Sequence, residues 1–185
     1  MMDFKERVIK AAEAIGQQNI DAMILFNYSN IRYFTDLRMN NAVESILIIT
    51  DDGEIIYLVP VLDYNRAIKT CWIENIVSFP EDNPNYLSPL KDILKGKKIN
   101  RIGIEQDVLT YHKMNFLRDL FNVELISVDK ILVDLRAVKT EEEINCIKKS
   151  AEILDKAMQE SLKLLREGIR ESEISAYAKY IMEKE

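Results

Sequence analysis

The feature that most constrains the fold is an alternation of short apolar runs with amphipathic helical segments over residues 1–127. The apolar runs have the length of β-strands and are bounded by turn-forming residues. The segments between them repeat apolar residues every three or four positions. This alternation is typical of an α/β domain in which helices flank a mixed sheet of five or six strands. The predicted strands are 20–26, 43–50, 54–60, 74–79, 100–106 and 123–128.

One strand pairing follows from a turn. The sequence DDG at 51–53 separates two strand-like runs, which predicts a tight hairpin between antiparallel neighbours. Helices are predicted between the strands, where start and stop signals frame the periodic segments. They are 4–15, a single turn capped by Ser29 or Asn30, 61–70, a proline-opened helix within 83–98 that Gly96 closes, and 110–121.

Strands cease after residue 127. We predict that 128–139 is a connector and that 140–185 holds two helices. Thr140 and Glu143 have the spacing of a capping box. From there an apolar stripe runs for about seven turns, and Gly168 is the predicted stop. The stripe consists of Ile144, Ile147, Ala151, Leu154, Met158, Leu162 and Leu165.

The second of these helices presents its own apolar side, formed by Ile174, Tyr177, Ala178 and Ile181. Two helices cannot bury two such faces against each other alone. Periodicity leaves two interpretations open: an appendage used for docking or dimerisation, or the start of a truncated second domain.

Composition excludes several classes of function. The formal net charge of −6 does not provide the basic face that nucleic acid requires. No run is apolar enough to span a membrane, and residues 1–20 are charged throughout, unlike a secretory leader. Cys71 and Cys146 share no metal or redox spacing, which favours two free thiols in a reducing compartment. A cytoplasmic protein is expected.

Residue by residue, the chain offers no active site. It has no phosphate-binding glycine loop, and with His112 as its single histidine it cannot assemble a His-based zinc site or triad. His112 is expected to face solvent, and Gly103 to be a packing residue within a strand. Asp51 and Asp52 suit a turn, and the glutamates at 141–143 suit a helix N-terminus. We predict no catalytic, cofactor-binding or metal-binding residue.

Three stretches nevertheless resemble one family. They are NYSNIRYFTDL (27–37), LRAVKTEEEINCIKKSAEI (135–153) and LREGIRESEISAYAKYIM (165–182). The chain is similar to the N-terminal part of the pita-bread metallopeptidases, namely Xaa-Pro dipeptidase (prolidase), aminopeptidase P and creatinase. The resemblance implies a mixed-sheet N-terminal domain in 1–127 and the first two helices of a truncated catalytic domain in 140–185. It also implies a homodimer and, for the intact enzyme, proline-containing peptides as substrates.

In this family two divalent metals, Mn or Co, are held by two Asp, one His and two Glu. The resemblance places all of those ligands beyond the second helix, so no residue of this chain is assigned to them. It also implies that the loop 36–45 reaches toward a partner's active site through Arg38, Asn40 and Asn41. The alternative is that these three are ordinary solvated loop residues. The family usually has Gly near Asp36 and a capping Thr near Arg170, so the last helix is expected to fray.

The sequence therefore predicts the N-terminal part of an Xaa-Pro dipeptidase (prolidase)-like metallopeptidase. It would contribute active-site capping and dimerisation and would be inactive as this chain alone. The alternative from another class is a stand-alone, non-catalytic interaction module of the same fold. A third hypothesis, an unrelated α/β domain with a helical hairpin, requires strand pairing within 128–185.

Overall fold

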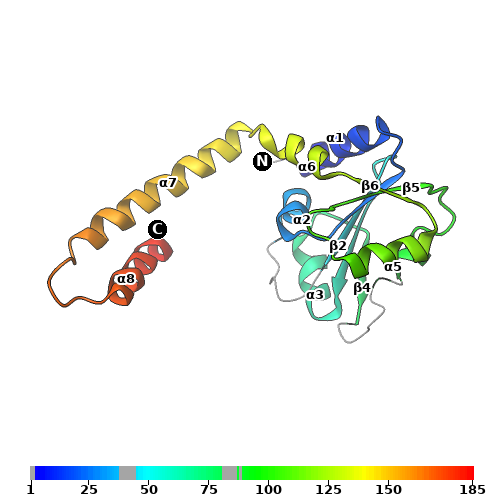
Figure 1. Cartoon of the computed structure of the whole chain (residues 1–185). Coiled ribbons are helices and arrows are strands. Elements are labelled where there is room, and N and C mark those ends of the chain that lie inside the picture. The colour runs from blue at the N-terminus through cyan, green and yellow to red at the C-terminus, as the bar shows by residue number, and fades with distance from the viewer. Residues whose placement is uncertain (1–2, 38–44, 81–86, 88) are drawn as a thin grey trace. The chain divides into compact units, whose positions relative to one another are not determined.

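The computed structural model describes residues 3–37, 45–80, 87 and 89–185 (Figure 1). The described chain divides into two compact units, and the division falls between Val138 and Lys139 in the sequence. The first contains a six-stranded mixed sheet with strand order β4-β3-β2-β1-β5-β6, which confirms the predicted fold class. Its strands are β1 (Ala22–Leu25), β2 (Ile46–Thr50), β3 (Ile55–Pro60), β4 (Ile76–Phe79), β5 (Arg101–Ile104) and β6 (Glu124–Ser127).

The sheet has an antiparallel centre and parallel flanks. β2 pairs antiparallel with both β1 and β3, as the DDG hairpin predicts. β5 runs parallel to β1 and to β6, and β4 runs parallel to β3. All four side chains of β1 are buried, because helices cover both faces of the sheet.

Alternate residues along each strand supply two separate cores. Met23 and Leu25 pack on one face with α1 (Phe4–Gly16), α2 (Tyr28–Thr35), α3 (Val61–Thr70) and α6 (Asp129–Ala137). Ala22 and Ile24 pack on the other face with α4 (Pro89–Ile93) and α5 (Tyr111–Phe121). The domain therefore has three layers, helix–sheet–helix, and the period-two alternation of the strands produces them.

Gly103 lies where the two parallel strands β1 and β5 meet the layer of α6. A Cβ placed on it would lie 2.4 Å from Cγ1 of Val128 and 3.1 Å from Cβ of Met23. No side chain fits into that space without displacing its neighbours. The predicted packing role of this glycine is confirmed.

Two predicted helix boundaries in this unit are wrong. α2 spans eight residues rather than one turn, and its cap is Asn27, whose Oδ1 accepts from the backbone N–H groups of Ser29 and Asn30. Its C-cap residue is Asp36, which adopts a left-handed conformation with φ of 56°. Within the described residues of the predicted 83–98 helix, α4 (Pro89–Ile93) ends three residues before Gly96, its predicted stop. Residues 81–86 and 88 lie outside the described residues.

Within the predicted connector, residues 129–137 form the helix α6. Ile131 and Leu132 are buried in the core beside α1, so this helix belongs to the first unit. Val138, the next residue, is extended and 84% exposed.

The second unit is a pair of packed helices, α7 (Glu141–Leu162) and α8 (Glu171–Lys184). The capping box at Thr140 is present: its Oγ1 accepts from the N–H of Glu143, whose carboxylate accepts from the N–H of Thr140. At α8 the Arg170 side chain makes no capping bond, but Glu173 Oε2 accepts from the Arg170 N–H at 3.1 Å. Half of a capping box is therefore retained there.

The predicted stop at Gly168 is wrong, because α7 ends at Leu162 and Gly168 lies in the following turn with φ of 83°. The predicted stripe is not what this helix buries. Its buried residues are Ala157 and Ser161, whereas four stripe residues on the helix are more than half exposed. Those four are Ile147, Leu154, Met158 and Leu162. No described helix is long and apolar enough to cross a membrane.

Candidate functional site

A polar cluster forms where two parallel strands end. Glu105 directly follows β5, and Phe26 and Asn27 directly follow β1, its parallel neighbour. The carboxyl ends of parallel neighbours meet at one edge of a sheet, and this edge is where α/β domains commonly place their polar groups. The candidate site therefore lies at this edge.

Glu105 is fully buried, with no exposed surface. One carboxylate oxygen, Oε2, accepts from the backbone N–H of Phe26 at 2.6 Å and of Asn27 at 2.9 Å. The other, Oε1, accepts from Nδ2 of Asn30 at 2.6 Å. A buried carboxylate is costly unless its oxygens are hydrogen-bonded, and three donors meet that requirement here. Glu105 thus fixes the turn between β1 and α2.

Asn30 extends this arrangement to α6. Its Oδ1 accepts from the guanidinium NH1 of Arg136 at 2.7 Å. The chain Glu105–Asn30–Arg136 has a defined polarity, because a carboxylate only accepts, a guanidinium only donates, and the amide between them does both. That polarity also fixes which way the Asn30 amide faces. Asn30 therefore connects a buried negative charge to a positive charge at the end of α6.

Tyr33, one turn further along α2, makes a second connection to α6. Its hydroxyl donates to the carbonyl oxygen of Leu135 at 2.9 Å. The Arg7 guanidinium lies 4.2 Å from the Tyr33 ring centroid and donates to the Tyr33 carbonyl at 2.6 Å. Phe34 meets the same ring edge-on, with centroids 5.0 Å apart. The tyrosine is thus held between α1 and α6.

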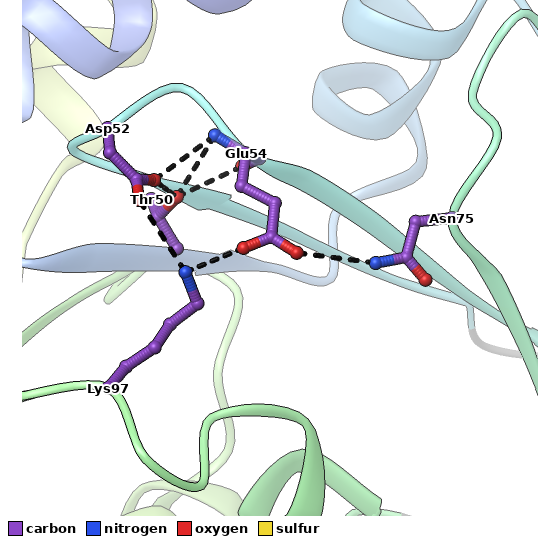
Figure 2. A network of polar contacts seen from close by, with 5 residues as sticks. All are labelled: Thr50, Asp52, Glu54, Asn75 and Lys97. Carbon is purple, nitrogen blue, oxygen red and sulfur yellow. Dashed lines mark hydrogen bonds and ion pairs between the residues drawn. The ribbon is translucent and has the colours of Figure 1, made fainter.

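A second polar cluster lies around the β2–β3 turn and is drawn in Figure 2. Lys97 pairs with Glu54 at 2.6 Å and with Asp52 at 3.6 Å, and Glu54 also accepts from Asn75. The Thr50 hydroxyl donates to Asp52, and this bond, followed by the Glu54 N–H, lowers the pKa of Asp52 below its usual range. Glu54 raises the pKa of Lys97.

This turn borders a cavity of about 260 Å³, lined by Asp21, Thr50, Asp51, Asp52, Lys97, Lys98 and Ile99. Two of its three acidic side chains have hydrogen-bond partners: Asp21 Oδ2 accepts from the N–H groups of Asn100 and Arg101, and Asp52 is bonded as described above. The cluster joins the hairpin to the segment before β5. We read it as a structural network.

Groups suited to metal binding are not gathered within the described residues, which contain no set of three or more His, Cys, Asp or Glu placed to hold an ion. His112 is exposed at the start of α5, as predicted. Both cysteines are free thiols, and burial raises the pKa of the Cys71 thiol, which keeps it protonated and weakly nucleophilic.

The predicted partner-contacting residues Arg38, Asn40 and Asn41 lie outside the described residues. The positions on either side of them are anchored in the first unit. Leu37 is buried and its N–H donates to Thr35 Oγ1, and the buried Ser45 Oγ accepts from the hydroxyl of Tyr57.

Sequence reasoning missed the Glu105–Asn30–Arg136 chain. A signal was present, because a glutamate directly following the fully apolar run of a buried strand requires a partner. The partners came from two stretches that carried the family resemblance, 27–37 and 135–153, but nothing in their spacing indicated that they meet.

Comparison with known proteins places this geometry in a family. The sequence model of the creatinase/prolidase N-terminal domain matches residues 7–138. An Xaa-Pro dipeptidase of Pyrococcus furiosus is 31% identical over 179 residues, which is 96% of this chain and 48% of that protein. A creatinase of a Bacillus species is 26% identical over 99% of this chain and 45% of its own length.

Among solved structures, the prolidase of Pyrococcus horikoshii superposes with a TM-score of 0.81 at 28% identity. That match covers 97% of this chain and 48% of the prolidase. The chain therefore spans about half the length of the relatives it matches. With the family model, the sequence relatives and the fold in agreement, the chain belongs to the creatinase/prolidase N-terminal domain family.

Proposed function

We propose that this chain is the N-terminal domain, with the first two catalytic-domain helices, of an Xaa-Pro dipeptidase (prolidase)-like metallopeptidase. One observation carries the proposal: the match to the Pyrococcus furiosus Xaa-Pro dipeptidase covers 96% of the chain, whereas the N-terminal domain match ends at residue 138. The likeness thus continues past the sheet unit into α7 and α8. The division of the described chain into two compact units between Val138 and Lys139 supports this two-part organisation.

In this proposal the chain contributes active-site capping and dimerisation and does no chemistry alone. The intact enzyme would bind two divalent metals, Mn or Co, and would cleave proline-containing peptides. A metal pair supplies an activated water and stabilises charge on the scissile carbonyl. The described residues of this chain do not fit that role, so we assign no step to them. The two free thiols suit a cytoplasmic location.

The exposed side of α7 supports a docking role for the second unit. Ile147, Leu154, Met158 and Leu162 are each between 52% and 57% exposed. Apolar residues repeating along one side of a helix are normally buried against another element. This side has the character of a surface that the rest of a catalytic domain, or a second copy, would cover.

The first test is enzymatic. The purified chain should not hydrolyse Xaa-Pro dipeptides with Mn²⁺ or Co²⁺ present. A chimera carrying residues 1–138 of this chain in place of the matching part of the Pyrococcus furiosus enzyme should be active. Its rate should exceed that of the catalytic half alone. Metal-dependent hydrolysis by the chain alone would contradict the proposal that it is inactive by itself. A folded but inactive chimera would contradict the proposal that residues 1–138 support the activity of the intact enzyme.

The alternative, a stand-alone interaction module, is separated by light scattering. A module predicts a discrete dimer whose mass does not change with concentration and in which the α7 side is protected. The enzyme-domain proposal predicts that the double substitution Leu154→Glu and Met158→Glu reduces aggregation of the chain in light scattering. It predicts no discrete oligomer that these substitutions would dissociate. Dissociation of a discrete dimer by that pair of substitutions would favour the module.

A further inference from the structure

The two stretches 27–37 and 135–153 meet in the structure, and their contact is not explained by the proposed function. From α2, Asn30 and Tyr33 reach the last turn of α6 by two hydrogen bonds. One bond engages the Arg136 side chain and the other engages the Leu135 backbone carbonyl. Leu135 and Arg136 lie three and two residues before Val138, the last residue of the first unit.

Both α2 residues are themselves braced. Asn30 is nearly buried, and its Nδ2 donates to Oε1 of Glu105. The other oxygen, Oε2, accepts from the N–H groups of Phe26 and Asn27 in the turn that starts α2. Tyr33 is fixed by the Arg7 guanidinium on its ring. A side chain that is already ordered loses little rotamer freedom when it forms a further bond, so the hold on α6 costs little entropy.

The helical conformation ends soon after these bonds. α6 ends at Ala137, and the exposed residues Val138, Lys139 and Thr140 lie between two helices. Thr140 then begins α7 with a complete capping box. Residues 138–140 thus separate two different helix ends. The end of α6 is bonded to α2, and the start of α7 is capped by its own residues.

We propose that Asn30 and Tyr33 are positioning residues that clamp the end of α6. The clamp holds the last turn of α6 to α2 and so confines the pivot between the two units to residues 138–140. Glu105 and Arg136 fix the orientation of the Asn30 amide in the clamp. Its NH₂ donates to the carboxylate of Glu105, which can only accept, and its oxygen accepts from the guanidinium of Arg136, which can only donate. The inference does not depend on which reaction the chain serves.

Amide hydrogen exchange on the full chain, read residue by residue by NMR, tests the clamp. In the unmodified chain the amides of residues 135–137 should be protected, and those of 138 and 139 should exchange rapidly. Tyr33→Phe removes the bond to the Leu135 carbonyl and Arg136→Ala removes the bond to Asn30. Each substitution should accelerate exchange at 135–137 about fivefold. The double variant should give about 25-fold. Core amides such as Ile102 and Ile104 should not change.

Lys130→Ala is the matched control, because it removes only an exposed pair with Asp134 in the first turn of the same helix. It should leave exchange at 135–137 within twofold. Limited trypsin digestion locates the pivot independently. The unmodified chain should be cut first after Lys139, and Tyr33→Phe, which keeps Arg136, should add cleavage after Arg136.

Three results would overturn the clamp. The first is equal exchange at 135–137 and at 138–139 in the unmodified chain. The second is unchanged exchange in a folded double variant. The third is equal acceleration of Ile102 and Ile104, because that would mean that the bonds contribute to global stability and do not specifically hold the helix end.

Discussion

Glu105→Gln is the sharpest test of the buried polar chain, because it changes one atom of the carboxyl group. Its amide oxygen can still accept from the N–H groups of Phe26 and Asn27. Its NH₂ would then face the Nδ2 donor of Asn30, which faces Glu105 Oε1 in the unmodified chain. Turning the Asn30 amide over would only move the donor–donor conflict to Arg136. No arrangement satisfies all the groups.

The magnitude follows from these bonds. One buried donor left unsatisfied costs about 1–3 kcal/mol, and two bonds to a charged acceptor become neutral at a loss of about 1 kcal/mol each. Loss of the charge also relieves the desolvation of Glu105, which offsets part of the cost. We expect the free energy of unfolding to fall by about 2 kcal/mol.

Urea denaturation followed by the fluorescence of Trp72 measures this change in the sheet unit itself. Trp72 is the single tryptophan, and its Nε1 donates to the Phe34 carbonyl at the end of α2. Glu124→Gln is the control, since it removes an exposed pair with Arg101 and should cost less than about 1 kcal/mol. A Glu105→Gln chain as stable as the control would refute the polarity argument.

Three further substitutions probe single features of the first unit. Gly103→Ala should lower the free energy of unfolding by about 1–3 kcal/mol, because its methyl group would overlap Val128, whereas Gly16→Ala, with 4.0 Å to its nearest neighbour, should cost nothing. Burial raises the pKa of Tyr57 to about 12. The neutral phenol therefore stabilises the fold fully below about pH 10, the unfolded pKa, and this contribution is lost as the pH rises through 12. Tyr57→Phe should flatten the loss of stability between those pH values in denaturation titrations. Asp36→Gly should raise the free energy of unfolding by about 0.5 kcal/mol, and with it the melting temperature, because Asp36 adopts a positive φ that glycine tolerates without strain. An unchanged or lower melting temperature would mean that the Asp36 side chain has a stabilising role of its own.

The sheet could be predicted because its strands are short apolar runs, each bounded by turn-forming residues. The hairpin at 51–53 shows this well, since a positive φ at Gly53 is a local requirement that the residue type records. The parallel pairing of β1 with β5 joins residues about 80 positions apart and left no such local mark.

Helix limits were harder to predict because competing caps lie within a few residues. Asn27 captures the start of α2 ahead of Ser29 and Asn30. α7 ends at Leu162, before Gly168, the glycine predicted to end it. Which apolar residues of α7 are buried depends on the side against which α8 packs. The polar chain through Glu105 depends on three segments meeting in space. Its residues could be read as ordinary polar positions until the fold joined them.

The central position of β1 has a consequence for how the domain forms. Its four residues, Ala22–Leu25, hold an antiparallel neighbour on one side and a parallel neighbour on the other. The β2–β3 hairpin can form locally and early, but closing β1 against β5 requires a loop of about 80 residues to be ordered. Folding rates fall as such distant pairings come to dominate. We therefore expect the β1–β5 seam to be the last part of the sheet to assemble and to set the rate at which the domain folds.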